Sequence, residues 1–190
     1  MRNVIFALAA TAALATPALA QERAPFTGVR VEGLAGWDRL QANGGHNDDI
    51  GYGAAVGYDM QLGHALVGVE GEYGDSNVRS CVGDKTVADP RLCAKTGRDL
   101  SVGARVGTVV GQRALLYAGA GYTNAGFKAT SNDGTNETTL ASTHLDGVRV
   151  KAGAEYAVGS RAYVKAEYRY SNYEQGVSRN QVLGGFGVRF

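Results

Sequence analysis

The chain has 190 residues, with 19 Lys and Arg against 18 Asp and Glu. That length suits a single domain, and the near balance of charge argues against a nucleic-acid partner, because such proteins usually carry a basic patch. Beyond the N-terminal region no run approaches about 18 consecutive apolar residues, so no transmembrane helix is expected.

The first 20 residues have the pattern of a secretory signal peptide. Arg2 is followed by an apolar stretch too short to span a bilayer, and the segment closes with Ala-Leu-Ala before Gln21. The small residues at its end disfavour a short membrane anchor, the alternative interpretation. We expect residues 1–20 to be cleaved, leaving a mature chain of 21–190. Only Arg2 is lost among charged residues, so the mature chain has 18 basic and 18 acidic residues.

Apolar residues recur at every second position over segments of about ten residues, which is the period of a β-strand. In 162–171, Lys165, Glu167 and Arg169 share one face, while Val, Ala and Tyr residues form the other. Eight such segments are expected as strands: 28–38, 50–60, 66–74, 99–109, 115–123, 147–158, 162–171 and 181–190.

The connections between these segments alternate in length. Short links at 61–64, 111–113 and 159–161 alternate with longer polar stretches at 39–49, 75–98, 124–143 and 172–180. This alternation predicts an up-and-down antiparallel meander with all its tight turns at one end. An even-stranded meander can close into a barrel and leave no free edge.

Aromatic residues lie near both ends of the apolar faces and flank a middle of Val, Ala and Leu. The long-loop end has Trp37, Tyr52, Tyr73, Tyr122, Tyr168 and Tyr170, and the short-turn end has Tyr58, Tyr156 and Phe190. Two such girdles are typical of a lipid-facing surface, and strands of about 9–11 residues suit a tilted bilayer crossing. We therefore expect the apolar faces to meet lipid and the polar faces to line the lumen.

The polar faces carry nearly equal numbers of cations and anions, as an enclosed interior requires. The lumen charge network is expected to contain Arg30, Glu32, Glu70, Glu72, Arg105, Arg149, Lys151, Glu155, Lys165, Glu167 and Arg169, on the same face as Asp38, Asp59, Asp99 and Arg189. Inward glycines leave room for these long side chains. A secreted soluble barrel of lipocalin type is the alternative, but its interior would need larger apolar side chains than Ala, Val and Gly.

The signal peptide, the eight strands and the terminal GGFGVRF resemble the small outer-membrane β-barrel family that includes the OmpA transmembrane domain and opacity-type surface proteins. The resemblance covers 21–190. It implies an all-β fold, an eight-stranded antiparallel up-and-down transmembrane β-barrel in the outer membrane of a Gram-negative bacterium, with short periplasmic turns and four longer extracellular loops. It also implies a monomer that contacts outer-membrane lipids and lipopolysaccharide.

Members of this family end in an aromatic residue that the barrel assembly machinery reads during biogenesis. Gly185, Val188 and Phe190 match the family pattern and are the expected assembly signal. Leu183 departs from it, because a polar residue is usual at that position.

Cys81 and Cys93 lie in the longest expected loop, 75–98. An even pair of cysteines in an exported chain predicts a disulfide, and two free thiols are the alternative. Two cysteines without nearby histidines fall short of a zinc site. Neither a metal nor a cofactor is expected.

Groups suited to catalysis do not converge in the sequence. His46 lies in the first long loop and His64 in a tight turn, while His144 follows Ser142 closely. A catalytic triad or a metal site needs several such groups together, and polar neighbours at a loop end are usually solvated. No enzyme is expected.

Three functions are compatible with this barrel. The leading hypothesis is a structural or surface-interaction role, in envelope integrity, adhesion or host contact, with an unidentified ligand at the extracellular loops. The second is a narrow porin-like channel for ions or small solutes, although eight strands enclose just enough space for side chains. The third is a lipid-modifying outer-membrane enzyme.

Overall fold

The computed structural model describes residues 25–42, 45–76, 79–84, 86, 91–132, 134 and 136–190. The expected signal peptide, 1–20, lies outside these residues. The elements are β1 (Gly28–Ala42), β2 (Gly45–Leu62), β3 (Ala65–Ser76), β4 (Arg79–Val82), β5 (Arg91–Val110), β6 (Ala114–Asn132), β7 (Glu137–Ala157), β8 (Ala162–Tyr173), the 3-10 helix η1 (Glu174–Gly176) and β9 (Ser178–Arg189). None of the described residues forms a helix long and apolar enough to cross a membrane.

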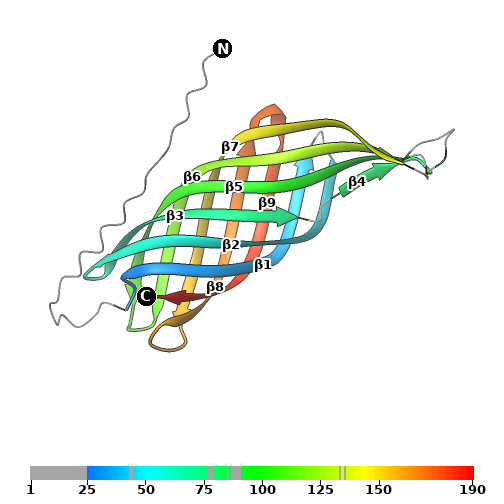
Figure 1. The fold of residues 1–190 in the computed structure, drawn as a ribbon. Helices are drawn as coiled ribbons and strands as arrows, with labels where there is room; N and C mark the ends of the chain where they lie inside the picture. Colours follow the sequence, from blue (N-terminus) through cyan, green and yellow to red (C-terminus); the bar gives the residue numbers. More distant parts are fainter. Residues whose placement is uncertain are drawn as a thin grey trace, which may run out of the picture.

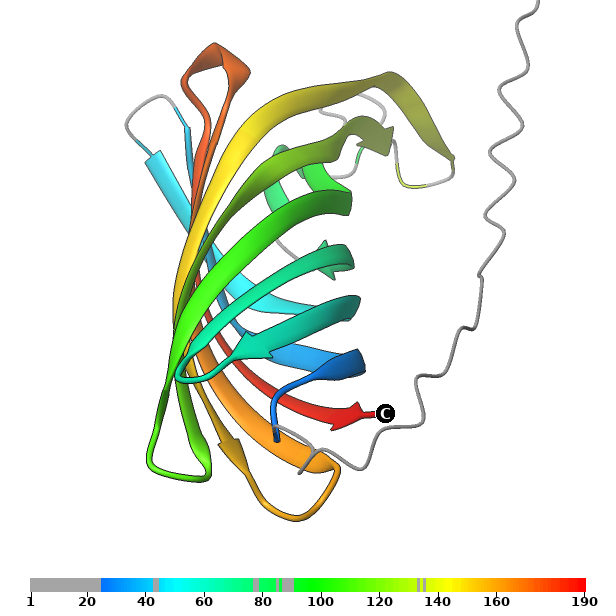
Figure 2. The same cartoon turned by 90° about the vertical axis from the view of Figure 1, so that its left-hand side faces the viewer.

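Eight antiparallel strands close into a barrel (Figure 1). The order runs from β3 through β2, β1, β9, β8, β7 and β6 to β5, and pairing between β3 and β5 completes the circle. Figure 2 shows the curved wall and the tight turns gathered at one end. Gly63 and Gly111 occupy two of these turns with φ of 64° and 65°, a left-handed conformation that favours glycine. The predicted up-and-down barrel is confirmed.

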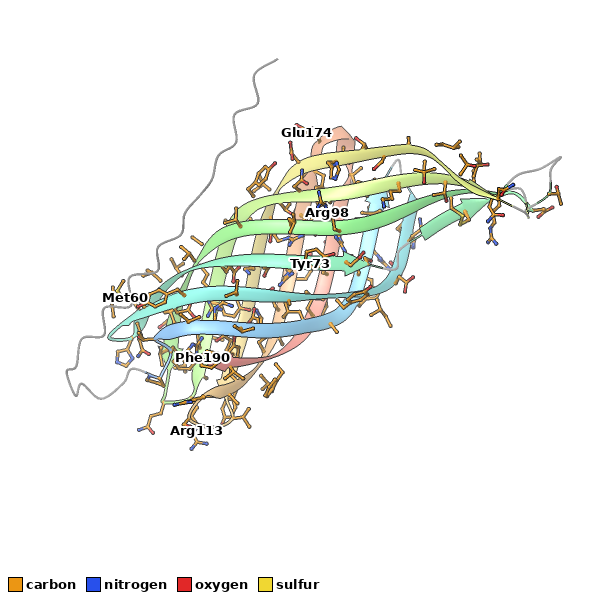
Figure 3. All side chains as sticks on the ribbon, viewed as in Figure 1. Met60, Tyr73, Arg98, Arg113, Glu174 and Phe190 are labelled. Atoms are coloured by element: carbon orange, nitrogen blue, oxygen red, sulfur yellow. A yellow bond between two sulfur atoms is a disulfide. The ribbon has the colours of Figure 1, made fainter. Side chains whose placement is uncertain are left out.

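Alternate residues of each strand face opposite environments. Arg149 is 4% exposed and points into the lumen, whereas its neighbour Val150 is 47% exposed on the outer surface. The other apolar residues of the strands follow the same rule, with Val69, Val102 and Val148 all exposed. Because lipid surrounds the outer surface of a membrane barrel, valines exposed there lie in an apolar environment that suits them. The lipid-facing girdles lie where the sequence predicts, with Tyr73 and Phe190 visible toward opposite ends in Figure 3.

Three strands are much longer than the sequence predicts. β5, β6 and β7 continue beyond the barrel, and the predicted loop 124–143 is mostly strand. β7 pairs with β8 only over Gly147–Ala157, but pairs with β6 as far as Glu137. The short strand β4 adds to β5 within the predicted loop 75–98. We call β4 together with residues 91–98, 124–132 and 137–146 the extracellular sheet; it projects toward the right of Figure 1.

The underestimated length of these strands has a physical cause. Strand prediction relied on an apolar face, and above the membrane neither face of a strand meets lipid. Apart from the apolar cluster around Ala125, Phe127 and Leu145, the extracellular sheet is rich in Thr, Ser, Asn and Lys. The two-residue period is therefore weak in the sequence although the backbone pairing continues.

Candidate functional site

Eight basic and eight acidic side chains fill the lumen in the described part of the chain, and we call them the lumen charge network. Each is at most 7% exposed. The members are Arg30, Glu32, Asp38, Asp59, Glu70, Glu72, Asp99, Arg105, Arg149, Lys151, Glu155, Lys165, Glu167, Arg169, Arg179 and Arg189. They include every residue that the sequence placed in the lumen, and they add Arg179.

The periplasmic part of the network centres on Asp59. Arg105 binds its carboxylate with two hydrogen bonds, of 2.9 and 2.6 Å. Arg30 Nε and Arg189 Nη2 lie 3.1 and 3.0 Å from Oδ2 of the same carboxylate. Glu155 also accepts from Arg105 at 2.5 Å and from Arg189 at 3.1 Å. Two carboxylates thus contact three guanidinium groups, and the remaining positive charge is balanced because Arg30 also pairs with Glu32 and Glu70.

The central part of the network contains both lysines. Lys165 Nζ lies 2.7 Å from Glu32 and 3.1 Å from Glu167. Lys151 pairs with Glu70 and lies 2.9 Å from Glu72. Arg30 links this part to Asp59, since it contacts Glu32 at 3.0 Å and also pairs with Glu70.

The extracellular part of the network begins at Glu72, which accepts hydrogen bonds from Arg169 at 2.7 Å and Arg149 at 3.2 Å. Arg149 also pairs with Asp99. Arg179 lies 2.9 Å from Asp99 and donates to Asp38 at 2.8 Å. The ion pairs therefore join all sixteen groups into one connected set. A buried charge is costly unless it is paired, and this set leaves no member without an opposite charge.

Hydroxyl groups supply the remaining contacts of several carboxylates. Tyr117 Oη donates to Glu167 at 2.5 Å, and Tyr163 Oη donates to Glu32 at 2.6 Å. Thr123 donates to Asp99 at 2.6 Å. The charge pattern of the sequence does not single out these tyrosines, although both sit at lumen positions of their strands. It also leaves out Arg179, because the polar composition of 172–180 predicts a loop, whereas β9 begins at Ser178.

Apolar clusters lie at both ends of the lumen charge network. Phe26, Leu66, Val109, Leu115 and Tyr117 form the periplasmic cluster, and Ala125, Leu145 and Tyr173 form the extracellular cluster with Phe127 and Val177 packed against it. The Arg189 guanidinium lies 5.2 Å from the Phe26 ring centroid, so the periplasmic cluster covers the network directly. Two cavities within the network, of about 20 and 10 Å³, are about large enough for one water each.

Lumen glycines make room for the large side chains of neighbouring strands. A Cβ on Gly153 would lie 2.6 Å from Tyr117 Oη, and one on Gly187 would lie 2.3 Å from the Tyr163 ring. At Gly57 it would lie 2.8 Å from Arg30 Nη2. The packing of the interior therefore depends on placing glycines next to large side chains from neighbouring strands.

Three carboxylates in the network, those of Glu32, Glu70 and Glu72, have ligand atoms within 4.8 Å of one another. Such a group could hold a metal ion if it were free. Each of the three is already paired with cations, Glu32 with Arg30 and Lys165 among them. The cluster is therefore part of the ion-pair set and does not make a metal site.

The histidine and serine considered for catalysis are not brought together with other catalytic groups. Ser142 and His144 are exposed and lie two residues apart on the same face of β7. His144 lies beside Arg98, with His144 Nε2 3.5 Å from Arg98 Nη2. His46 lies on β2, and His64 lies in the turn before β3. These positions are scattered over both ends of the barrel.

Cys81 and Cys93 form a disulfide between β4 and β5. The two residues stand directly opposite each other in the strand pairing, with an S–S distance of 2.06 Å and a Cα–Cα distance of 4.1 Å. The predicted disulfide is confirmed. It ties the edge strand of the extracellular sheet to the long hairpin of β5 and β6.

The last strand places the expected assembly signal at the periplasmic end of the barrel. Phe190 is 64% exposed toward lipid, and its N–H donates to the Val29 carbonyl at 2.8 Å. Packing also favours glycine at position 185, because a Cβ there would lie 2.7 Å from both Leu34 Cδ2 and Lys165 Cγ. Recognition by the assembly machinery stays a prediction.

An exposed ion pair marks the extracellular rim on β1 and β2. Arg39 donates to both carboxylate oxygens of Asp48, at 2.7 and 2.8 Å, and lies 4.8 Å from the Trp37 ring centroid. The hydrogen bonds from Arg39 hold the pKa of Asp48 below its usual value.

Comparison with known proteins agrees with this architecture. Residues 6–190 match the family model of the outer membrane protein beta-barrel domain. A 22 kDa outer membrane protein of Rhizobium leguminosarum bv. viciae is 31% identical over 172 residues, covering 83% of this chain and 75% of that protein.

Two solved structures have the same fold. Ail, the attachment invasion locus protein of Yersinia pestis, superposes with a TM-score of 0.61 at 19% identity, over 86% of this chain and 99% of Ail. Neisserial surface protein A superposes with a TM-score of 0.59 at 18% identity, over 86% of this chain and 98% of that protein. By its family match over residues 6–190 and its 31% identical relative, the chain belongs to the outer-membrane protein β-barrel family.

Proposed function

We propose that this protein is a surface-interaction protein, whose barrel anchors the extracellular sheet in the outer membrane. The lumen charge network carries this proposal. Sixteen paired charges occupy the lumen, and apolar clusters lie at both of its ends. An interior filled in this way suits a rigid anchor, and the extracellular sheet is then the part available for contact.

The biogenesis that accompanies this role follows the family. We infer export by the signal peptide 1–20, insertion of the barrel domain 21–190 through the barrel assembly machinery with Gly185, Val188 and Phe190 as the signal, and a monomer surrounded by outer-membrane lipids and lipopolysaccharide. The lipid-facing valines and aromatic girdles support the membrane contact.

The extracellular sheet has the features of a contact surface. Its strands stand clear of the barrel, and its edge is fastened by the Cys81–Cys93 disulfide. Thr and Ser residues of β7 line it, exposed at Thr138, Thr139 and Ser142. Ail was solved in complex with sucrose octasulfate, a heparin analogue. A sulfated glycan is therefore the first partner to test on this sheet.

The competing function, a narrow channel, makes a different electrical prediction. The refolded mature chain, checked for heat-modifiable gel migration, should leave planar bilayers silent in single-channel recording. Stable conductance steps that respond to Glu70→Gln would contradict the proposal and support a pore.

The surface role is tested with the double variant Arg91→Gln and Lys128→Gln, which removes two basic residues of the extracellular sheet, the kind of group that pairs with a sulfate. The variant keeps the whole barrel. Bacteria displaying the full chain should be retained on heparin-coated beads, and bacteria displaying the double variant should be retained much less. Equal retention of the two would exclude these basic residues as the contact for a sulfated glycan.

A further inference from the structure

A short segment that precedes β1 lies across the periplasmic mouth of the barrel, and we call residues 25–28 the N-terminal strap. Pro25 and Thr27 are exposed, but the Phe26 side chain between them is 0% exposed. Its ring packs in the periplasmic cluster, whose other members lie on β3, β5 and β6. β6 is four strands away from β1 in either direction around the wall. The ring therefore reaches from one side of the mouth toward the other.

The Phe26 ring lies between the lumen charge network and the periplasm. The Arg189 guanidinium is 5.2 Å from the centroid of this ring and 4.9 Å from that of the Tyr163 ring, a cation–π arrangement that is stronger when water is excluded. Arg189 in turn pairs with Asp59 and Glu155, at 3.0 and 3.1 Å. Phe26 thus covers the periplasmic part of the network with an apolar group.

The N-terminal strap is attached more lightly than the strands are. Pairing of β1 with β2 runs from Ala42 to Gly28, which lies opposite Asp59. Beyond Gly28, the Phe26 N–H donates to Gln61 Oε1 at 3.2 Å, and the Gln61 N–H donates to Thr27 Oγ1 at 3.0 Å. Neutral hydrogen bonds of this kind contribute little net stability. The strap is consequently held in place mainly by the buried Phe26 ring.

Gly28 forms the base of the N-terminal strap, and its backbone suits a hinge. Its φ is 133°, a conformation open to glycine. A Cβ at this position would lie 2.1 Å from the Phe190 carbonyl oxygen, so the last residue of the chain packs directly against it. Hinges are formed by a few residues at the ends of elements, which absorb the backbone rotation. Rotation at Gly28 would move the strap and leave the β1–β2 pairs from Val29 onward intact.

We propose that the N-terminal strap is a lid that opens and closes the periplasmic mouth of the barrel. With Phe26 seated, the lumen charge network is sealed from periplasmic water. With the strap turned outward about Gly28, water reaches Arg189, Asp59 and Glu155 while the strands stay paired. The extracellular cluster is built from other residues, so the lumen opens at one end only. This inference goes beyond the proposed function and needs only the barrel fold.

The alternative is that Phe26 is an ordinary core residue, exposed only when the whole barrel unfolds. The two mechanisms differ in what happens at the opposite ends of the lumen. Opening of a lid exposes the periplasmic cluster alone, whereas global unfolding exposes both apolar clusters together.

Cysteine labelling measures the exposure at each end. Leu115→Cys reports on the periplasmic cluster and Leu145→Cys, in a separate chain, on the extracellular cluster. Cys81 and Cys93 are joined, so each introduced cysteine is the single free thiol. The mature chains are refolded in phosphatidylcholine nanodiscs, which leave both ends in water, and are treated with a charged maleimide.

Phe26→Ala should speed the labelling of Leu115→Cys by about tenfold or more, because burial of a phenylalanine ring shifts an opening equilibrium by at least that factor. Labelling of Leu145→Cys should not change. Phe26→Leu is the matched control, since leucine keeps an apolar side chain on the strap, and it should leave the labelling of Leu115→Cys slow. Heat-modifiable migration shows that each variant is folded.

Two outcomes would overturn the proposal. Unchanged labelling of Leu115→Cys in the Phe26→Ala chain would mean that the seal does not depend on the strap. Faster labelling at both reporter positions would mean that the barrel as a whole is loosened. Retention on heparin should be the same for Phe26→Ala as for the full chain, so the lid and the surface role are tested independently.

Discussion

The lumen and the lipid-facing surface of the barrel are built from the same strands, yet they obey opposite rules. Arg149 and Val150 are neighbours in the chain, and the arginine is buried while the valine is exposed. On the outer surface each side chain is satisfied by lipid, whatever its neighbours are. In the lumen each charge is satisfied only by partners, such as Asp38 for Arg179, which lies 141 residues away along the chain.

This difference shows where specificity resides in the molecule. The outer surface tolerates exchange among apolar residues, because hydrocarbon contacts are nonspecific. The lumen charge network depends on matched pairs, because removing one buried partner leaves the other uncompensated. Substitutions of similar size should therefore have effects that depend on which face they occupy.

Asp59→Asn should have the largest effect. It removes the negative charge shared by Arg30, Arg105 and Arg189 but keeps the shape of the side chain. We expect a loss of about 3–5 kcal/mol in the free energy of unfolding, as for a broken buried ion pair. Urea unfolding in lipid vesicles, followed by the fluorescence of Trp37, the single tryptophan, measures it.

Two further variants define this effect. Asp48→Asn removes an exposed carboxylate at the rim and should give no measurable change, because exposed ion pairs contribute little. Adding Arg189→Gln to Asp59→Asn restores the charge balance and should recover part of the lost stability. If Asp48→Asn and Asp59→Asn were equally harmful, the distinction between the lumen and the exposed surface would fail.

Ala152→Arg tests the lipid-facing surface at its middle. Ala152 is exposed and lies midway along β7 between Val148, which pairs with Tyr122, and Tyr156 of the periplasmic girdle. A charge at mid-membrane should cost about 2–4 kcal/mol of unfolding free energy, measured in the same vesicles.

Ala152→Leu is the matched control and should be close to neutral, because it adds only apolar surface. Val150 lies two residues nearer than Ala152 to the extracellular end of β7, pairing with Tyr170 where Ala152 pairs with Tyr168. Val150→Arg should therefore cost less than Ala152→Arg, since the cost falls toward the interface. An equal cost at both positions would place the bilayer differently on the barrel.

The sequence predicted the faces of the strands well because alternation is a local property. Lys165, Glu167 and Arg169 could be placed in the lumen from their spacing alone. The pairing of Asp59 with three arginines from β1, β5 and β9 could not, because it depends on how the strands are staggered around the closed barrel. The contact of Arg98 with His144 is likewise invisible in the sequence, because it arises where the pairing of β5 with β6 shifts between Thr96 and Asp99, a β-bulge that leaves no periodic signal.

The extracellular sheet marks the limit of pattern-based prediction. Residues 137–146 pair with β6, but their apolar residues, Leu140, Ala141 and Leu145, do not recur at every second position, so the strand character of the segment is visible only in the backbone. The lumen position of Arg179 could not be predicted for a related reason, because the polar sequence around it resembles a loop. Above the membrane, backbone hydrogen bonding is supplemented by the small apolar cluster of Ala125, Leu145 and Tyr173 and by the Cys81–Cys93 disulfide.

The smallest effects are expected from substitutions of two glycines, one on each face of the barrel wall. Gly153→Ala places a Cβ in the lumen 2.6 Å from the Ala166 carbonyl oxygen and 2.6 Å from Tyr117 Oη. The strand backbone has little freedom to move, so overpacking should cost about 1–3 kcal/mol of unfolding free energy. Gly33→Ala places a Cβ on the lipid-facing surface, where no atom lies within 4 Å. It should be neutral or slightly stabilising, because alanine restricts the unfolded chain more than glycine does. Equal changes in the two urea midpoints would mean that the lumen can repack, and that its alternation of glycines with large side chains is not required for stability.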